Sequence, residues 1–260
     1  MQAMRNTSLI TTLNDDLLLT ILLEITNYAK LVDPWSTREQ IRPIVTTRHC
    51  SHICCHWRSI MLSSSTIWGR LVDLDYLLSR KTDDWTAEIM ERAGEALLWV
   101  YGSMVDYQGA RNHLLSTFLQ ENWARVEMLV VTDALHSILE QRKKMWAFLH
   151  EPAPRLRWVD LSVDTMDADE FLPVPWNLFA DKAPLLTEFR MDRYKFWTDA
   201  SWIPNLCDVT FYSDFHPSEA LEAVQGMPHL QYLDVSIGID TITESIVFIA
   251  HDKGTLITLC

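Results

Sequence analysis

The sequence is poor in glycine and lacks the motifs that phosphate and nucleotide chemistry requires. Its 260 residues include seven glycines, and none of them forms a GxGxxG or P-loop pattern. It also has no GxSxG nucleophile elbow and no HExxH metal motif. The acidic stretch at 160–170 lacks the glycine and the spacing of an EF-hand loop. We therefore expect a protein that is not an enzyme and that carries no cofactor and no metal.

Basic tracts, long apolar runs and an export signal are missing as well. The net charge is −13 and lysine and arginine do not cluster, which argues against nucleic-acid binding. No apolar run is long enough to cross a bilayer, and the first 16 residues lack the apolar core of a secretory signal. We expect a cytoplasmic or nuclear protein with reduced cysteines and no membrane partner.

Apolar residues make up 48% of the chain, which is enough for a core, and cysteine and histidine gather in one place. Residues 48–62, "RHCSHICCHWRSIML", contain three of the five cysteines and three of the nine histidines. Ile53, Trp57, Ile60 and Met61 recur at helical spacing, and Cys54 borders the same stripe. A zinc site needs four converging ligands, and no second Cys or His pair completes one. The pattern therefore favours a buried face of one helix.

A second amphipathic helix is predicted upstream, in "LNDDLLLTILLEITNYA". Asn14 is a suitable N-cap, and Leu13 and Leu18 are spaced for a hydrophobic staple. The apolar stripe of this helix is wide, so we expect it to be buried by its own domain on one side and by a partner on the other.

Together, "LNDDLLLTIL" and "HICCHWRSIMLSSSTIWGRL" resemble an F-box of the kind common in fungal proteins. The resemblance covers residues 9–75, with Asn14 in place of the usual proline and an inserted segment at 30–43. The matching positions are Leu13, Leu17, Leu18, Ile21, Ile53, Cys54, Trp57, Arg58, Leu62, Ser63, Ile67 and Trp68.

The resemblance implies a docking module and no chemistry of its own. F-box proteins bind a Skp-type adaptor, which links them to a cullin and a RING protein so that a bound substrate is ubiquitinated. The implied adaptor-binding residues are Leu13, Leu17, Leu18, Ile21, Ile53, Cys54, Trp57 and Trp68.

The remainder, residues 76–260, shows a degenerate repeat. Segments of the form Pro-x-apolar-x-x-apolar-x-apolar begin at 154, 184, 204 and 228, with related segments at 124 and 254. Helical patterns fill the intervals around 114–119, 135–149, 220–224 and 242–250. The pattern resembles a leucine-rich-repeat array, so we expect a helical F-box bundle followed by a curved α/β solenoid. The alternative is an ordinary α/β domain with parallel strands.

Strand alternation predicts which repeat residues face outward. If the last two apolar anchors of each repeat point inward, the residues before them share the opposite face. This face is acidic and aromatic and suits a basic peptide of a substrate, although half of its members could simply be solvated. The predicted substrate-binding residues are Trp158, Asp160, Glu188, Arg190, Asp208, Tyr232 and Asp234.

Two functions fit these patterns. The first is a substrate receptor of a Skp–cullin–F-box ubiquitin ligase. The second is a non-catalytic leucine-rich-repeat scaffold whose F-box-like part packs only against its own repeats.

Overall fold

The protein folds into two compact units of mixed helix and strand. The computed structural model describes residues 13–27, 42–77, 84–105, 109–135, 143–163, 177–192, 196–211, 215, 217–239, 242–251 and 254–259. The first unit is Met1–Asp73 with Lys81–Leu97, and the second is Leu74–Arg80 with Leu98–Cys260. The helix at 84–93 thus groups with the first unit, whereas a division after residue 75 assigns it to the second. Residues 28–41, which hold most of the predicted insertion, lie outside the described residues.

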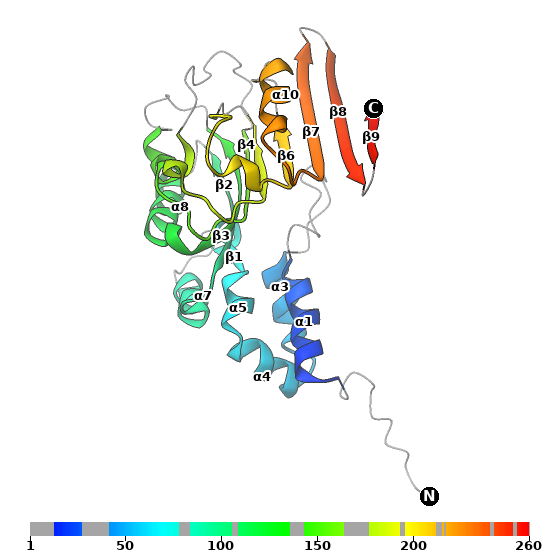
Figure 1. The fold of residues 1–260 in the computed structure, drawn as a ribbon. Coiled ribbons are helices and arrows are strands. Elements are labelled where there is room, and N and C mark those ends of the chain that lie inside the picture. The colour runs from blue at the N-terminus through cyan, green and yellow to red at the C-terminus, as the bar shows by residue number, and fades with distance from the viewer. Residues whose placement is uncertain are drawn as a thin grey trace, which may run out of the picture. The chain divides into compact units, whose positions relative to one another are not determined.

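The first unit is mainly helical (Figure 1). Asn14 caps its first helix by accepting a 2.9 Å hydrogen bond from the Asp16 amide, which confirms the predicted cap. Pro43 stands in the first turn of the next helix, where its missing N–H costs nothing. The elements are α1 (Asp15–Ile25), α3 (Pro43–Cys50), α4 (Cys55–Ser63), α5 (Ser65–Gly69), β1 (Val72–Asp73) and α7 (Asp84–Ala93).

The cysteine-rich stretch forms two helices, so the prediction of one helix was wrong. α3 ends at Cys50, a turn follows, and α4 begins at Cys55. Cys54 is the N-cap of α4, and its sulfur accepts a hydrogen bond from the Trp57 amide at 3.5 Å. Ile53 therefore precedes the helix and does not continue the apolar face of Trp57 and Met61.

Large apolar side chains form the core of the helical unit. Leu18 and Leu22 of α1 are buried together with Trp57 and Met61 of α4. The Trp68 indole donates a 2.8 Å hydrogen bond to the Met61 carbonyl, which ties α5 to the end of α4. Burying such side chains stabilises the unit by about 1.5–3 kcal/mol each.

The second unit is built on a sheet whose strands β2 to β9 are neighbours in chain order. Strands β2 to β7 run parallel, as the alternation of strand and helix predicts. The strands are β2 (Leu98–Val105), β3 (Val126–Ala134), β4 (Trp158–Val163), β5 (Glu188–Met191), β6 (Asp208–Phe211), β7 (Tyr232–Ile239), β8 (Ile242–His251) and β9 (Gly254–Leu259).

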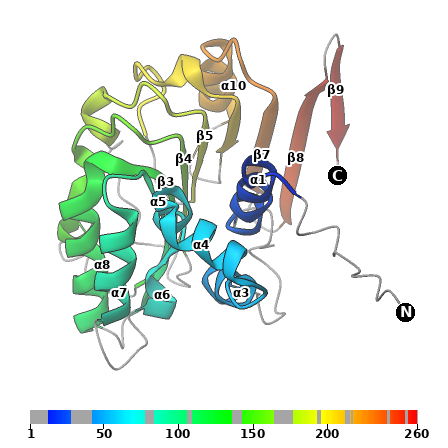
Figure 2. The same cartoon turned by 90° about the horizontal axis from the view of Figure 1, so that it is seen from below.

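Helical segments connect the parallel strands. The helices predicted around 114–119 and 220–224 are confirmed, and Figures 1 and 2 show both on one face of the sheet. Residues 136–142 of the third predicted helix lie outside the described residues. The segments are α6 (Leu74–Leu77), α8 (Gly109–Asn122), η3 (Trp123–Arg125), η4 (Ala147–His150), η5 (Leu178–Asp181), η6 (Ile203–Asn205) and α10 (Pro217–Gln225).

The predicted helix at 242–250 is wrong, because this segment is strand β8. β8 pairs antiparallel with β7, and β9 pairs antiparallel with β8. Five of the ten residues of β8 are β-branched, and such side chains are restricted in a helix but fit a pleated sheet. The parallel series therefore gives way to an antiparallel meander after β7.

The predicted inward anchors are confirmed in β4, β5 and β6, whereas Val235 of β7 is only half-buried. Val159, Phe189 and Val209 are fully buried and occupy matching positions in β4, β5 and β6. Aromatic rings extend this core, with Phe189 4.6 Å from Phe196 and 5.0 Å from Trp202 between ring centroids. Such ring pairs stabilise a core beyond the area they bury.

Candidate interaction surfaces

The helical unit exposes large aliphatic side chains beside its core. Leu17 is 57% exposed and Ile21 is 42% exposed, one turn apart on α1, while Leu18 and Leu22 on the adjoining row are buried. Ile53, in the turn before α4, is 54% exposed, and Leu62 near the end of α4 is 40% exposed. Helix α1 thus has two adjoining apolar rows. Other described residues of the chain cover the row of Leu18 and Leu22, and the row of Leu17 and Ile21 stays exposed.

The eight predicted adaptor-binding residues fall into three groups. Leu17, Ile21 and Ile53 are exposed. Leu13 and Cys54 are half-buried. Leu18, Trp57 and Trp68 belong to the core and hold α1, α4 and α5 together, so they are not available at the surface. Leu62 matches the family pattern but was not among the eight, and its exposure adds it to the surface-facing set.

The seven predicted substrate-binding residues meet on one face of the sheet. Trp158, Glu188, Asp208 and Tyr232 occupy one register row across β4 to β7. Asp160, Arg190, Thr210 and Asp234 occupy the next row. They alternate with Val159 and its counterparts and so lie on the opposite face. We call the set Trp158, Asp160, Glu188, Arg190, Asp208, Tyr232 and Asp234 the strand-face cluster.

Arg190 lies at the centre of the strand-face cluster. Its Nη2 donates a 2.8 Å hydrogen bond to Asp208 Oδ2, across the neighbouring strands β5 and β6. Its guanidinium carbon is 5.9 Å from the Trp158 ring centroid and 6.0 Å from that of Tyr232. These distances are at the outer limit of a cation–π contact. Arg190 on β5 therefore lies near a carboxylate on β6 and near aromatic rings on β4 and β7.

Burial raises the pKa of three carboxyl groups in this cluster. For Asp160, burial is the main cause, the charge of Arg190 lowers the pKa, and Asp208 raises it again. Burial likewise raises the pKa of Glu188 and of Asp234, with Asp208 adding to the rise and Arg190 opposing it. Burial lowers the pKa of Arg190, but the hydrogen bond and charge of Asp208 outweigh it and the net change is upward. The positive charge of Arg190 therefore offsets only part of the cost of burying these three carboxylates.

Four polar atoms of the cluster are buried without a hydrogen-bond partner among the described residues. They are Trp158 Nε1, Arg190 Nε, Asp208 Oδ1 and Asp234 Oδ1. An unpaired buried polar group costs about 1–3 kcal/mol, so such groups are normally paired. Their concentration on one half-buried face indicates a surface whose hydrogen bonding is incomplete.

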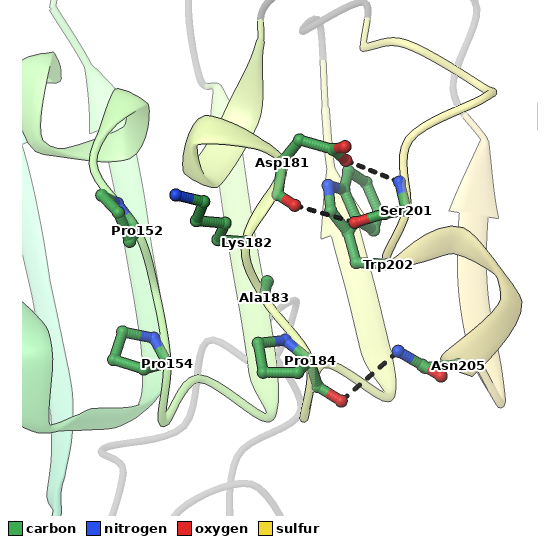
Figure 3. A pocket seen from close by; sticks show the side chains of 9 residues that line it. All are labelled: Pro152, Pro154, Asp181, Lys182, Ala183, Pro184, Ser201, Trp202 and Asn205. Atoms are coloured by element: carbon green, nitrogen blue, oxygen red, sulfur yellow. Dashed lines mark hydrogen bonds between the residues drawn. The ribbon is translucent and has the colours of Figure 1, made fainter.

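A hollow of about 480 Å³ lies along the turns that precede β4, β5 and β6 (Figure 3). Three of its polar side chains are paired: Asp181 accepts a hydrogen bond from the Ser201 amide, Ser201 Oγ donates one to the Asp181 carbonyl, and Asn205 donates one to the Pro184 carbonyl. Prolines, Lys182, Ala183 and Trp202 complete the lining, and the Trp202 indole N–H is buried without a hydrogen-bond partner among the described residues. The groove thus holds one carboxylate, which is paired, whereas Asp208 and Asp234 of the strand-face cluster each have an unpaired oxygen, and this makes the cluster the stronger candidate for binding.

Searches for other kinds of site and for relatives add nothing to these surfaces. Among the described residues, no three His, Cys, Asp or Glu side chains are placed to hold a metal ion. No helix in the described part of the chain combines the length and apolar character that a bilayer crossing requires. Comparisons with protein-family models, curated proteins and solved structures found no match. A functional assignment therefore depends on the sequence resemblance and on the two surfaces.

Proposed function

We propose that this protein is a substrate-receptor subunit of a Skp–cullin–F-box ubiquitin ligase. The helical unit docks onto a Skp-type adaptor, and the sheet face carrying the strand-face cluster binds a protein substrate. The protein itself performs no chemistry in this role. The proposal combines the F-box resemblance of residues 9–75 with the two exposed surfaces.

The exposed aliphatic row on α1 is the observation that carries the proposal. Leu17 and Ile21 stand on one side of a helix whose neighbouring row, Leu18 and Leu22, is already buried. Covering two such side chains removes apolar surface from water, worth about 25 cal/mol per Å². An amphipathic helix that presents residues i and i+4 in this way is suited to a groove or helix of a partner protein.

Co-elution with a purified Skp-type adaptor in size-exclusion chromatography tests the docking. We expect the wild-type chain to co-elute and Leu17→Asp to elute separately, because the charge would be buried against the adaptor. Leu221→Asp is the matched control, since Leu221 is 64% exposed on helix α10 of the other unit. Trp57 is unsuited to this test, because it is buried at 6% exposure and its replacement would disturb the core.

Two results would overturn the docking role. If the wild-type chain and the adaptor elute as independent peaks, the non-catalytic scaffold is the better assignment. If Leu17→Asp and Leu221→Asp reduce co-elution equally, the interaction reflects charge and not the apolar row on α1.

A further inference from the structure

We propose that the hollow in Figure 3 binds a carboxylate attached to an apolar group, as in the C-terminal residue of a peptide. The carboxylate accepts a hydrogen bond from the Trp202 indole N–H, and Lys182 balances its charge. We call this site, whose nine lining residues Figure 3 labels, the proline hollow. It lies within the sheet unit and is independent of the proposed ligase role.

Successive turns of the chain form the proline hollow. Pro154 stands four residues before Trp158, the first residue of β4, and Pro184 stands four residues before Glu188, the first residue of β5. A proline ring fixes φ and leaves no backbone N–H, so these walls are rigid, apolar and without donors of their own. The volume of about 480 Å³ lies within the range of about 300–1,000 Å³ that is usual for small-ligand sites.

Three oxygens on the walls of the proline hollow already accept hydrogen bonds from the protein. The Asp181 carboxylate accepts one from the Ser201 amide, and the Asp181 carbonyl accepts one from the Ser201 hydroxyl. The Lys182 carbonyl accepts a 2.9 Å hydrogen bond from the Ala153 amide. A ligand that brought only donors would therefore compete with bonds that the protein has already made.

Two donors of the proline hollow, in contrast, have no acceptor. Trp202 is 1% exposed, and its Nε1 is buried without a hydrogen-bond partner among the described residues. Lys182 is exposed, and its Nζ forms no ion pair with any described residue. A buried N–H without a partner is destabilising, so an acceptor that a ligand brings to Trp202 recovers this loss. The unpaired groups here are donors, the opposite of the unpaired oxygens in the strand-face cluster.

The indole nitrogen can be reached without breaking a hydrogen bond of the proline hollow. Trp202 Nε1 has no partner to lose, and the bonds between Asp181 and Ser201 use other atoms. Figure 3 shows the indole beside these two residues, with its nitrogen on the side of Lys182. The nitrogen is covered in the ligand-free chain, so binding requires the lining side chains to part. Lys182 is exposed and unpaired, and its flexible stem can move its ammonium toward a bound anion.

An anion with an apolar group fits this set of walls and donors. Among the nine lining residues, Lys182 is the one cation and Asp181 is the one carboxylate, which already accepts from the Ser201 amide. A hydrogen bond to a carboxylate is about twice as strong as one between neutral groups. The C-terminal residue of a peptide can place an apolar side chain against the proline rings directly beside its carboxylate. In an Asp or Glu residue the side chain itself ends in the carboxylate, so no apolar group accompanies it.

An NMR titration of the full-length, ¹⁵N-tryptophan-labelled chain with three probes tests this proposal. N-acetyl-phenylalanine has the α-carboxylate and an apolar side chain, N-acetyl-phenylalanine amide lacks the carboxylate, and N-acetyl-glutamate amide has its carboxylate on the side chain. Salt at about 0.15 M screens repulsion by the net charge of −13. We expect N-acetyl-phenylalanine to shift the Trp202 indole signal saturably, the glutamate probe to bind several-fold more weakly, and the phenylalanine amide to bind at least about tenfold more weakly. The signal is assigned by its loss in Trp202→Phe.

Lys182→Gln tests the charge of the proline hollow at an exposed position that forms no ion pair. We expect this variant to bind N-acetyl-phenylalanine about fivefold more weakly, as for loss of one exposed ion pair. Lys144→Gln, at another exposed lysine of the sheet unit, makes the same charge change and should bind like the wild type.

Three results would overturn the proposal: equal binding of N-acetyl-phenylalanine and its amide, no shifted indole signal, or equal binding by Lys182→Gln and Lys144→Gln. Tighter binding of the glutamate probe than of N-acetyl-phenylalanine would overturn the choice of a C-terminal residue. The probe comparisons need only the wild-type chain, so misfolding of a variant does not obscure them. Adaptor co-elution is a separate measurement, and its failure leaves this site unaffected.

Discussion

The two units present surfaces of opposite character. The helical unit exposes Leu17 and Ile21 beside a well-filled core, so the surface that this row of α1 offers is apolar. The sheet unit buries the apolar side chains on one face of its strands and leaves charged and aromatic groups half-covered on the other face, with Arg190 among carboxylates. The first kind of surface supplies binding energy through area, and the second supplies selectivity through charge and hydrogen bonding. In the proposed function, the first surface binds the adaptor and the second binds the substrate.

The largest expected effect compares the buried and exposed rows of α1. Leu18→Ala should lower the free energy of unfolding of the helical unit by about 2–5 kcal/mol, because Leu18 is fully buried and its loss leaves a cavity. Leu17→Ala, at a 57% exposed position, should change it by about 0.5 kcal/mol or less. Urea unfolding followed by circular dichroism measures both, and equal losses would contradict the two-sided description of the helix.

The next effect concerns the cation of the strand-face cluster. Arg190→Met should destabilise the sheet unit by about 1–3 kcal/mol, because it leaves Asp208 half-buried without its ion-pair partner. Arg157→Met is the control, since Arg157 is 58% exposed in its pair with Glu127 and an exposed pair contributes about 0–1 kcal/mol. Thermal unfolding of the two variants gives the comparison, and an Arg190→Met protein as stable as Arg157→Met would show that the cluster is already well solvated.

A smaller effect separates backbone strain from packing. Gly94, after α7 in the helical unit, has φ of +49°, and a Cβ there would meet nothing within 4 Å. Gly94→Ala should therefore cost about 1–2 kcal/mol through the left-handed backbone alone. Gly109, at the start of α8 in the sheet unit, is equally open but has no such conformation. Gly109→Ala should be neutral or stabilising by up to about 1 kcal/mol in the same unfolding assay.

The smallest effect is a pH dependence of the sheet unit. The pKa of Asp160 is raised above its ordinary 3.8, so the folded protein holds this proton more tightly than the unfolded chain does. Stability from this group is therefore lost as the pH rises through the window above about 4. Between about pH 4 and pH 7, Asp160→Asn should lose less stability than the wild type, measured as the shift in urea midpoint. Asp199→Asn, at an exposed position of the same unit, is the control for removing one carboxyl group, and an unchanged slope in Asp160→Asn would exclude Asp160 as a source of the dependence.

Much of this architecture can be predicted from the pattern of apolar residues. The period of two in segments such as "PRLRWVDL" places Val159 inward and Trp158 outward, and the strands follow that prediction. The cap at Asn14 is equally local, because its hydrogen bond reaches only two residues along the chain. Local patterns of this kind survive in the fold because no tertiary contact opposes them.

Sequence-based prediction fails where one segment fits both helical and strand spacing, or where contacting residues come from strands that are far apart in the sequence. "ITESIVFIAH" satisfies helical spacing at Ile242, Ile246 and Ile249, but its β-branched content and the adjoining strand β7 favour a strand. The pattern around Cys54 carries no common N-cap residue, so the break between α3 and α4 has no clear sequence signal. The position of Arg190 between two rings and a carboxylate depends on register across three strand pairs, which no local pattern encodes.

The antiparallel meander has a practical consequence for handling the protein. Among the described strands, β9 pairs with β8 alone, so its other side presents backbone N–H and C=O groups in a row. A strand edge of this kind is a template for strand addition by a second molecule, and the two antiparallel strands are rich in isoleucine, valine and threonine. Light scattering over a dilution series, run before any binding assay, would show whether sedimenting aggregates contribute to an observed complex.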